Sequence, residues 1–149
     1  MDFESAKINT EKKLKVADHL LGTTYSFVKD PKLLLSVIDN LFQALDLAIT
    51  TLVDFEKKTD NSIEKIDFFR RKIIPKYSLE REILDFYIEL KDLLEFHKNS
   101  GMEFSAKEKF IMADNDYNLK SLKYEDVKNK YLLTKKYVYK IFDILTHLI

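Results

Sequence analysis

The chain contains no cysteine and only two glycines and two prolines in 149 residues. The lack of cysteine excludes disulfide bonds, thiolate zinc sites and cysteine nucleophiles. So few glycines and prolines favour long helices over a turn-rich β fold, and the glycine-rich phosphate loops of nucleotide-binding enzymes are absent. Apolar residues make up 46% of the chain, which is enough for the core of a single domain spanning residues 1–149.

The chain also lacks a net charge, because 25 lysines and arginines balance 25 aspartates and glutamates. No global field therefore attracts the protein to nucleic acid or to a membrane. Three of the basic residues are arginines, so few guanidinium groups are present for bidentate recognition of phosphate. The charge is unevenly distributed, since residues 117–149 hold seven lysines and three acidic residues, a local charge of +4.

No targeting segment or membrane span is predicted. The N-terminal stretch MDFESAKINTEKK lacks the apolar core of a signal peptide. The most apolar run, LLLSVIDNLFQALDLAITTLV, contains Asp39, Asn40, Gln43 and Asp46, whereas a membrane span requires about 20 residues with few or no charges. We therefore expect a cytoplasmic protein that makes no membrane contact.

Apolar residues at spacings of three and four predict four long helices. We expect these helices at residues 3–29, 31–58, 61–98 and 124–147. Asp30-Pro31 separates the first two, because aspartate caps helices and proline suits the first helical position. Asn61 and Glu64 fit a capping box at the start of the third helix, and Pro75 is expected to break or kink it.

The second predicted helix also carries a polar stripe. Its residues recur at helical spacing, at Asp39, Gln43, Asp46, Thr50 and Asp54. The stripe could be a row of binding residues, but a solvated outer face is the interpretation that we favour.

Between the third and fourth helices, from Met102 to Lys123, the apolar period is lost. The stretch is open to three interpretations: an extended excursion, a small hairpin, or a short helix followed by a loop. An insertion of about 20 residues without regular structure is unusual in a compact domain and is often functional. Four long helices with short connections predict an all-α fold, an antiparallel four-helix bundle (up-down) with a kinked third helix and an irregular excursion before the last helix.

The histidines do not match a known metal motif. Di-metal helical bundles place a glutamate three residues before a metal-binding histidine, and this glutamate is missing before all three histidines. The H-E-x-x-H zinc motif is absent as well. Asp143 and His147 are four residues apart and could share a helix face, but a lone pair of this kind is typical of a surface contact. We expect no metal and no other cofactor.

One candidate binding site lies where the third helix is expected to end, at His97, Ser100 and Glu103. These residues could form a nucleophile and base set, or a loop that contacts a ligand or RNA. Alternatively, His97 caps the last carbonyl groups of the helix, Gly101 reverses the chain in the left-handed conformation, and Glu103 is solvated. We favour the cap, because catalytic sets are recognised by geometry rather than by spacing, and we assign no catalytic residue.

The other candidate site is the last helix, which interleaves lysines and tyrosines. Its sequence YEDVKNKYLLTKKYVYK contains the candidate binding residues Lys128, Tyr131, Lys135, Lys136 and Tyr139. Lysine and aromatic side chains together can bind single-stranded nucleic acid through charge and stacking. The same residues are also typical of the solvated outside of a bundle helix, with tyrosines at its rim.

The order and composition of the helices resemble the HEPN superfamily of small helical bundles. The resemblance is carried by ADHLLGTTYSFV, LFQALDLAITTLVDF and DYNLKSLKYEDVKNKYLLTKKYVYKIFDIL, in which Asp116-Tyr117 and a polar loop precede the last helix. It implies a bundle that is commonly dimeric. Members include metal-independent ribonucleases of toxin–antitoxin and defence systems, and inactive relatives that partner nucleotidyltransferases.

Active members of this superfamily carry an arginine followed four to six residues later by a histidine. Here the nearest such pair is Arg81 and His97, which are sixteen residues apart. The resemblance therefore implies a non-catalytic module that interacts with a protein partner or associates with RNA as a homodimer. The alternative is a HEPN-type ribonuclease with a departed active site, around His97 or around the Arg70-Arg71 pair.

Overall fold

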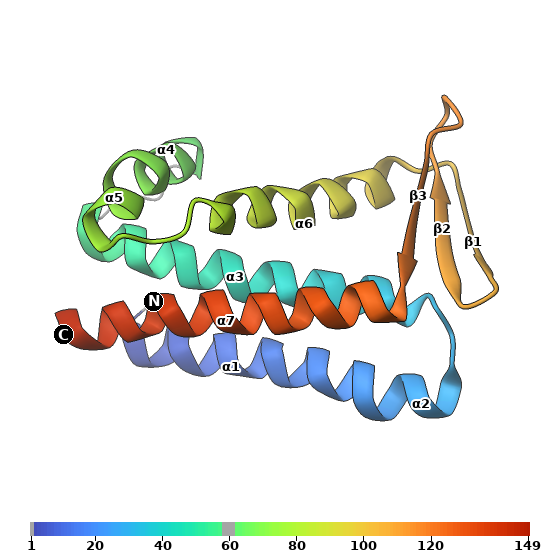
Figure 1. Cartoon of the computed structure of the whole chain (residues 1–149), viewed down its shortest axis with the longest axis horizontal. Helices are drawn as coiled ribbons and strands as arrows, with labels where there is room; N and C mark the ends of the chain where they lie inside the picture. Colours follow the sequence, from blue (N-terminus) through green and yellow to red (C-terminus); the bar gives the residue numbers. More distant parts are fainter. Residues whose placement is uncertain (1, 58–61) are drawn as a thin grey trace.

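The structure, a computed structural model, describes residues 2–57 and 62–149. Asn61 lies outside the described residues, as does the side chain of Glu64, so the predicted capping box is not described. Within these ranges, four long helices alternate in direction along the long axis of the molecule (Figure 1). A short helical segment lies at one end of the molecule, and a three-stranded sheet lies at the other end.

The first long helix runs continuously from Phe3 to Val28 but changes its winding. It consists of α1 (Phe3–His19), the π-helical turn η1 (Leu20–Thr24) and α2 (Tyr25–Val28). The wider turn coincides with Gly22, whose carbonyl oxygen accepts a hydrogen bond from Ser26 Oγ at 2.5 Å. Glycine weakens the regular helical conformation, which favours a local change of winding at this point.

The chain then reverses into the second long helix, α3 (Leu33–Lys57). Lys29 adopts a left-handed φ of 52° and ends α2. Asp30 Oδ1 accepts a hydrogen bond from the Lys32 N–H at 3.0 Å, so Asp30 caps the turn that opens α3, as the sequence predicts.

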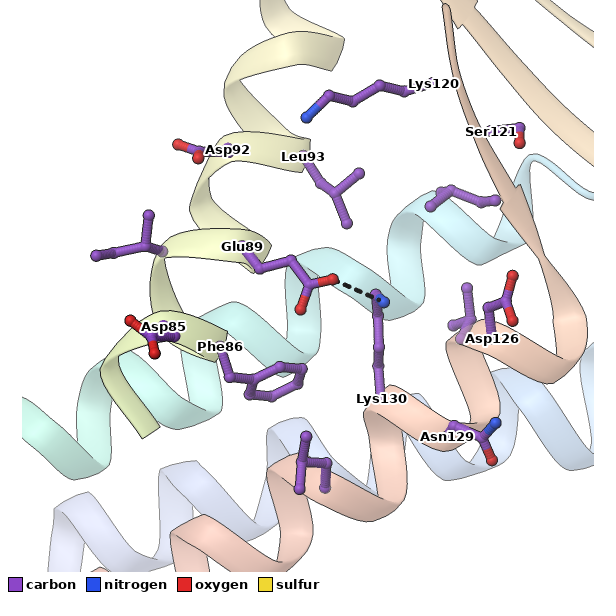
Figure 2. A pocket seen from close by; sticks show the side chains of 14 residues that line it. Asp85, Phe86, Glu89, Asp92, Leu93, Lys120, Ser121, Asp126, Asn129 and Lys130 are labelled. Carbon is purple, nitrogen blue, oxygen red and sulfur yellow. Dashed lines mark hydrogen bonds and ion pairs between the residues drawn. The ribbon is translucent and has the colours of Figure 1, made fainter. Parts of the chain in front are cut away.

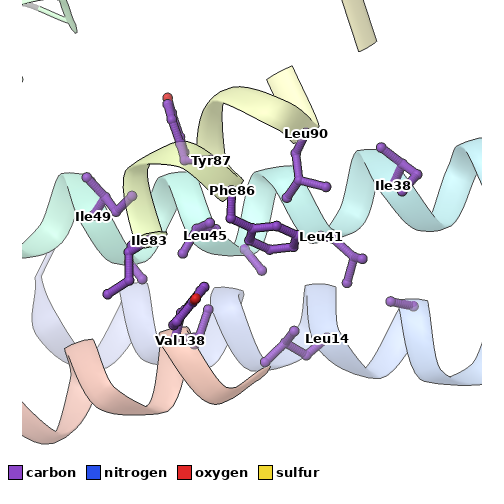
Figure 3. Close-up of a cluster of buried hydrophobic side chains, with 14 of the residues drawn as sticks. Leu14, Ile38, Leu41, Leu45, Ile49, Ile83, Phe86, Tyr87, Leu90 and Val138 are labelled. Carbon is purple, nitrogen blue, oxygen red and sulfur yellow. The ribbon is translucent and has the colours of Figure 1, made fainter. Parts of the chain in front are cut away.

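α3 is the central helix of the core (Figure 3) and packs against α1, α6 and α7. Its largest completely buried side chains are Leu34, Ile38, Leu41, Leu45, Ile49 and Leu52. Ile83 and Leu90 of α6 and Val138 of α7 complete this part of the core. Among the described residues, α3 is also the one helix that is long and apolar enough to cross a membrane by length and composition alone. In this fold its apolar stripe is covered by other helices.

The predicted third helix is in fact two separate helices. The first part consists of α4 (Ser62–Phe68), the π-helical turn η2 (Phe69–Ile73) and α5 (Ile74–Tyr77), and the second part is α6 (Glu82–Asn99). Pro75 has no N–H to donate to the preceding turn, and the π-helical turn directly precedes it. Ser78 then takes a left-handed φ of 52° and ends the segment. Of the predicted break or kink, the structure therefore shows a break, which lies at Ser78, three residues after Pro75.

The predicted all-α class is wrong, because residues 102–123 form a three-stranded antiparallel sheet rather than an irregular excursion. The strands are β1 (Met102–Ala106), β2 (Lys109–Ala113) and β3 (Leu119–Lys123), in the order β1-β2-β3. Phe110 and Met112 of β2 and Leu122 of β3 are buried in the core. The fold is mainly helical with a small sheet, and β3 leads directly into the last helix, α7 (Tyr124–Leu148).

Both turns of the sheet adopt conformations that no glycine marks in the sequence. The β1–β2 turn consists of Lys107 and Glu108, with φ values of 48° and 66°, as in a two-residue hairpin. In the β2–β3 turn, Asp114 Oδ1 accepts hydrogen bonds from the backbone N–H groups of Asp116 and Asn118, both at 2.9 Å. Hydrogen bonds from Asn118 lower the pKa of the Asp114 carboxyl, so this carboxylate holds the turn closed.

Candidate functional site

The structure brings His97, Ser100 and Glu103 into contact where α6 meets β1. His97 Nδ1 is paired with Glu103 Oε2. Ser100 Oγ lies 2.7 Å from Glu103 Oε2 and 2.9 Å from the His97 carbonyl oxygen. Burial raises the pKa of the Glu103 carboxyl, but the hydrogen bonds from Ser100 and His97 outweigh it and lower this pKa. The carboxylate therefore links the end of α6 to the first strand instead of being fully solvated.

This geometry differs from that of an activated serine nucleophile. In such a site the hydroxyl donates its proton to a histidine nitrogen. The acceptors near Ser100 Oγ are instead a carboxylate oxygen and a backbone carbonyl oxygen. Ser100 is also the residue that ends α6, with an extended backbone. Ser100 thus caps the end of α6, whereas the His97 ring is paired with Glu103 and not, as predicted, with a carbonyl group of the helix.

Gly101 does not adopt the left-handed conformation that the sequence interpretation requires, since no glycine of the described residues has a positive φ. Its N–H donates a hydrogen bond to the Ala113 carbonyl oxygen at 2.9 Å. A Cβ atom on residue 101 would lie 2.8 Å from Asn115 Oδ1. Asn115 Oδ1 is the end of a side chain that can rotate away, so this contact alone does not require a glycine at residue 101.

Two residues of the polar stripe, Asp46 and Thr50, belong to a polar cluster that joins α3, α4 and α6. Asp46 Oδ1 accepts hydrogen bonds from the Tyr87 hydroxyl at 2.7 Å and from Lys65 Nζ at 2.8 Å. Lys65 Nζ also donates to Thr50 Oγ1 at 3.0 Å. Burial raises the pKa of Tyr87, and the hydrogen bond to Asp46 raises it further. Part of the polar stripe on α3 therefore holds neighbouring helices in place, and is not simply a solvated face.

The candidate residues of the last helix divide between two faces of α7. Four of them follow helical spacing on one face, and we call them the lysine–tyrosine stripe: Lys128, Tyr131, Lys135 and Tyr139. Within the stripe, Lys135 Nζ lies 5.8 Å from the centre of the Tyr139 ring. Lys136 is directed toward the connection between α5 and α6, where its Nζ lies 3.6 Å from Glu80 Oε1. The structure thus separates Lys136 from the stripe.

The stripe begins at a cavity that the sequence did not predict. The cavity has a volume of about 640 Å³ and lies between α2, the β1–β2 turn and the first turn of α7. Four lysines line it, and we call it the lysine cavity: Lys29, Lys107, Lys109 and Lys123. No ion pair of the described residues includes any of these lysines. Tyr25 and Tyr124 also line it, with their ring centres stacked 4.9 Å apart, and Glu108 and Glu125 are its acidic residues.

A second depression lies between α6, β3 and α7, with a volume of about 690 Å³ (Figure 2). We call it the acidic groove because Asp85, Glu89, Asp92 and Asp126 line it together with two lysines, Lys120 and Lys130. Lys130 Nζ lies 3.2 Å from Glu89 Oε1, so one ion pair crosses the groove. The remaining lining is largely apolar.

The arginines lie far from the histidine of the first candidate site. Arg70 and Arg71 belong to η2, at the end of the molecule opposite the sheet, whereas His97 lies in the last turn of α6 beside the sheet (Figure 1). Arg71 Nε is paired with Asp67 Oδ1 at 3.1 Å. No group of three or more His, Asp or Glu side chains within the described ranges is placed to hold a metal ion.

Comparisons of the chain with protein-family models, with curated proteins and with solved structures give no significant match. The HEPN resemblance therefore stays a prediction, and the geometry of the stripe, the cavity and the groove is the basis for a functional proposal.

Proposed function

We propose that this chain is a HEPN-like, non-catalytic module that binds single-stranded RNA along the lysine–tyrosine stripe and the lysine cavity. The continuity of these two features is the observation that carries the proposal. Tyr124 lines the cavity and lies one helical turn before Lys128, the first residue of the stripe. We call the lysine cavity and the lysine–tyrosine stripe together the RNA track. From Tyr124 to Tyr139 this track is about 22 Å long at 1.5 Å per residue.

The side chains of this track match the two chemical parts of single-stranded RNA. Lysine ammonium groups bind phosphates, and tyrosine rings offer stacking surfaces to bases of any sequence. Because the lysines of the cavity have no carboxylate partners among the described residues, RNA would not have to displace an existing ion pair. Lysine lacks the bidentate fork of arginine, so we expect binding with little sequence preference.

Three acidic residues oppose this binding and limit its strength. Glu108 and Glu125 line the lysine cavity. Burial raises the pKa of the Tyr131 hydroxyl, and the nearby Asp18 of α1 raises it further. Since the chain has no net charge, the local lysines alone supply the attraction, and we expect affinity that falls steeply with salt.

The test is fluorescence anisotropy of a labelled oligouridine RNA over a range of salt concentrations. Replacing both Lys128 and Lys135 with alanine should weaken binding about tenfold at low salt, and should reduce the slope of log K against log salt by about 0.7 per lysine. Lys136→Ala is the matched control, because Lys136 lies on the other face and is paired with Glu80. An equal loss in both variants, or no binding by the unmodified chain, would contradict the proposal.

The proposal includes a homodimer, as the family resemblance implies, and a location in the cytoplasm, as the sequence predicts. Large apolar side chains exposed on α1 and α7, namely Ile8, Val16 and Leu132, support a surface for self-association. Light scattering at high protein concentration should give twice the mass of one chain. A single-chain mass at every concentration would remove the dimer from the proposal without affecting RNA binding.

Ribonuclease activity is the second candidate function, and the contact between His97, Ser100 and Glu103 is the observation in its favour. The hypothesis requires that the chain cleaves transfer RNA or single-stranded RNA and that His97→Ala abolishes the cleavage. Because His97 lies outside the stripe, the same variant should bind RNA normally. If no cleavage is observed, or if the variant cleaves as well as the unmodified chain, this function is excluded.

A further inference from the structure

The acidic groove lies between α6 and α7 and is open to solvent. α6 and α7 both pack on α3, and Figure 2 shows Glu89 and Leu93 of α6 and Lys130 of α7 directed into the space between the helices, whereas Asp85 and Asp92 lie at its rim, on the outer side of α6. The ion pair between Lys130 and Glu89 crosses it. The walls on the long sides are helices whose backbone groups are already paired. Along these two walls an occupant would have to satisfy its own backbone hydrogen bonds, as a helix does.

The charge of the groove is negative although the chain as a whole is neutral. Asp85, Glu89 and Asp92 follow one another at spacings of four and three along α6, and Asp126 lines the groove from α7. Asp85, Asp92 and Asp126 take part in no ion pair of the described residues. Of the two lysines, Lys130 is paired with Glu89, and Lys120 Nζ lies 5.4 Å from the centre of the Phe96 ring. Four carboxylates against two ammonium groups leave a local charge of −2.

The floor and one edge of the groove are apolar. Phe86, Leu122 and Val127 form a closely packed floor and are almost completely buried. Ile88 on α6 remains 36% exposed, and Leu133 on α7 is half-buried. These two side chains would lose solvent contact if an apolar side chain entered the groove between them.

We propose that the acidic groove is the docking site for an amphipathic helix of a partner protein, with apolar side chains on the floor and lysines or arginines facing the carboxylates of α6. Grooves between helices commonly take an amphipathic helix through apolar anchors at helical spacing. The unpaired carboxylates select a basic partner over an acidic one, because like charges would repel across the rim. Lys130 and Lys128 lie on different faces of α7, so this docking is independent of the proposed RNA track.

The experiment is a selection from a displayed library of single helices. The apolar positions i, i+4 and i+7 are fixed, and the flanking positions are randomised among charged and polar residues. Selected helices should carry lysine or arginine beside the apolar stripe. Replacing Asp85 and Asp92 together with lysine should weaken their binding at least about tenfold, since two attractions become repulsions. Asp143→Lys is the matched control, because Asp143 is an exposed carboxylate of α7 outside the groove.

Several outcomes would overturn the docking proposal. The proposal fails if no helix is enriched, or if the selected helices carry acidic or neutral residues beside the apolar stripe. It also fails if the helices bind the double variant and the control equally well. Finally, it fails if the helices shift backbone amide signals in NMR spectra only outside α6, β3 and α7. Circular dichroism must first show that both variants keep the helical content of the unmodified chain. If the double variant also loses a homodimer in light scattering, the groove is a self-association surface and the partner proposal fails. None of these outcomes changes the RNA test, which relies on Lys128 and Lys135.

Discussion

At the scale of single residues, Thr10 is an exception in a well-paired core. Its side chain is completely buried in α1, and its hydroxyl has no hydrogen-bond partner in the described part of the chain. An unpaired buried hydroxyl costs free energy. Thr10→Val, which replaces this hydroxyl with a methyl group, should therefore raise the free energy of unfolding by about 1 kcal/mol in urea denaturation.

Thr134 provides the matched control for this substitution. It is equally buried, but its Oγ1 donates a hydrogen bond to the Lys130 carbonyl oxygen at 2.8 Å. Thr134→Val should therefore leave stability unchanged or lower it slightly. A stability gain in both variants would show that general hydrophobicity, rather than the missing partner of Thr10, is responsible.

Glu56 is a carboxylate whose ionisation stabilises the fold. The hydrogen bond from the Tyr77 hydroxyl, and then those from Lys76 Nζ, lower the pKa of its carboxyl. Because the folded pKa lies below the unfolded one, this contribution is present near neutral pH and is lost as the pH falls below about 4.5. An NMR titration should show that Tyr77→Phe raises the Glu56 pKa toward its usual value. An unchanged pKa would show that Tyr77 is not the cause.

At the scale of elements, the attachment of α4 and α6 to α3 depends on Asp46. Asp46→Asn would remove the charge opposite Lys65, whose side chain is 14% exposed. Burying an ammonium group without its partner is unfavourable, so we expect a loss of about 1–3 kcal/mol in the free energy of unfolding. Asp39→Asn on the exposed face of the same helix should change it by less than about 0.5 kcal/mol. Equal effects would contradict the assigned role of the cluster.

The β1–β2 turn carries Lys107 and Glu108 at positive φ, where asparagine and glycine are preferred. Replacing the pair with Asn and Gly should raise the melting temperature by a few degrees, because both residues adopt this conformation at lower cost. Thermal unfolding followed by circular dichroism measures the change. A lower melting temperature would mean that contacts of the two original side chains outweigh the backbone preference.

The length and spacing of the helices and strands explain how much of the fold could be predicted from the sequence. Apolar side chains repeated every three or four residues over more than twenty residues predicted the long helices, and Asp30 predicted the reversal between the first two. A small hairpin was one of three interpretations of residues 102–123, but the strands were not assigned because each has five residues, too few for a period of two to stand out. The turn at Lys107 and Glu108 has no glycine or asparagine to indicate a hairpin.

At the scale of the whole molecule, the candidate site was only partly predictable. The lysine–tyrosine stripe lies within one helix, so its spacing was visible in the sequence. The lysine cavity gathers residues from α2, the sheet and α7, and the acidic groove gathers them from α6, β3 and α7. Both the cavity and the groove depend on the three-stranded sheet at one end of the molecule. This sheet was not predicted from the sequence.

The central claim is that RNA follows one track along α7, and photochemical cross-linking tests it most directly. Ultraviolet irradiation of the chain with single-stranded RNA, followed by mass spectrometry of the digested protein, locates the residues in contact with bases. The account predicts cross-links at Tyr124, Tyr131 and Tyr139, and their loss when Lys128 and Lys135 are replaced by alanine. Cross-links confined to η2 or to the His97 region, or no cross-links under conditions of binding, would contradict it.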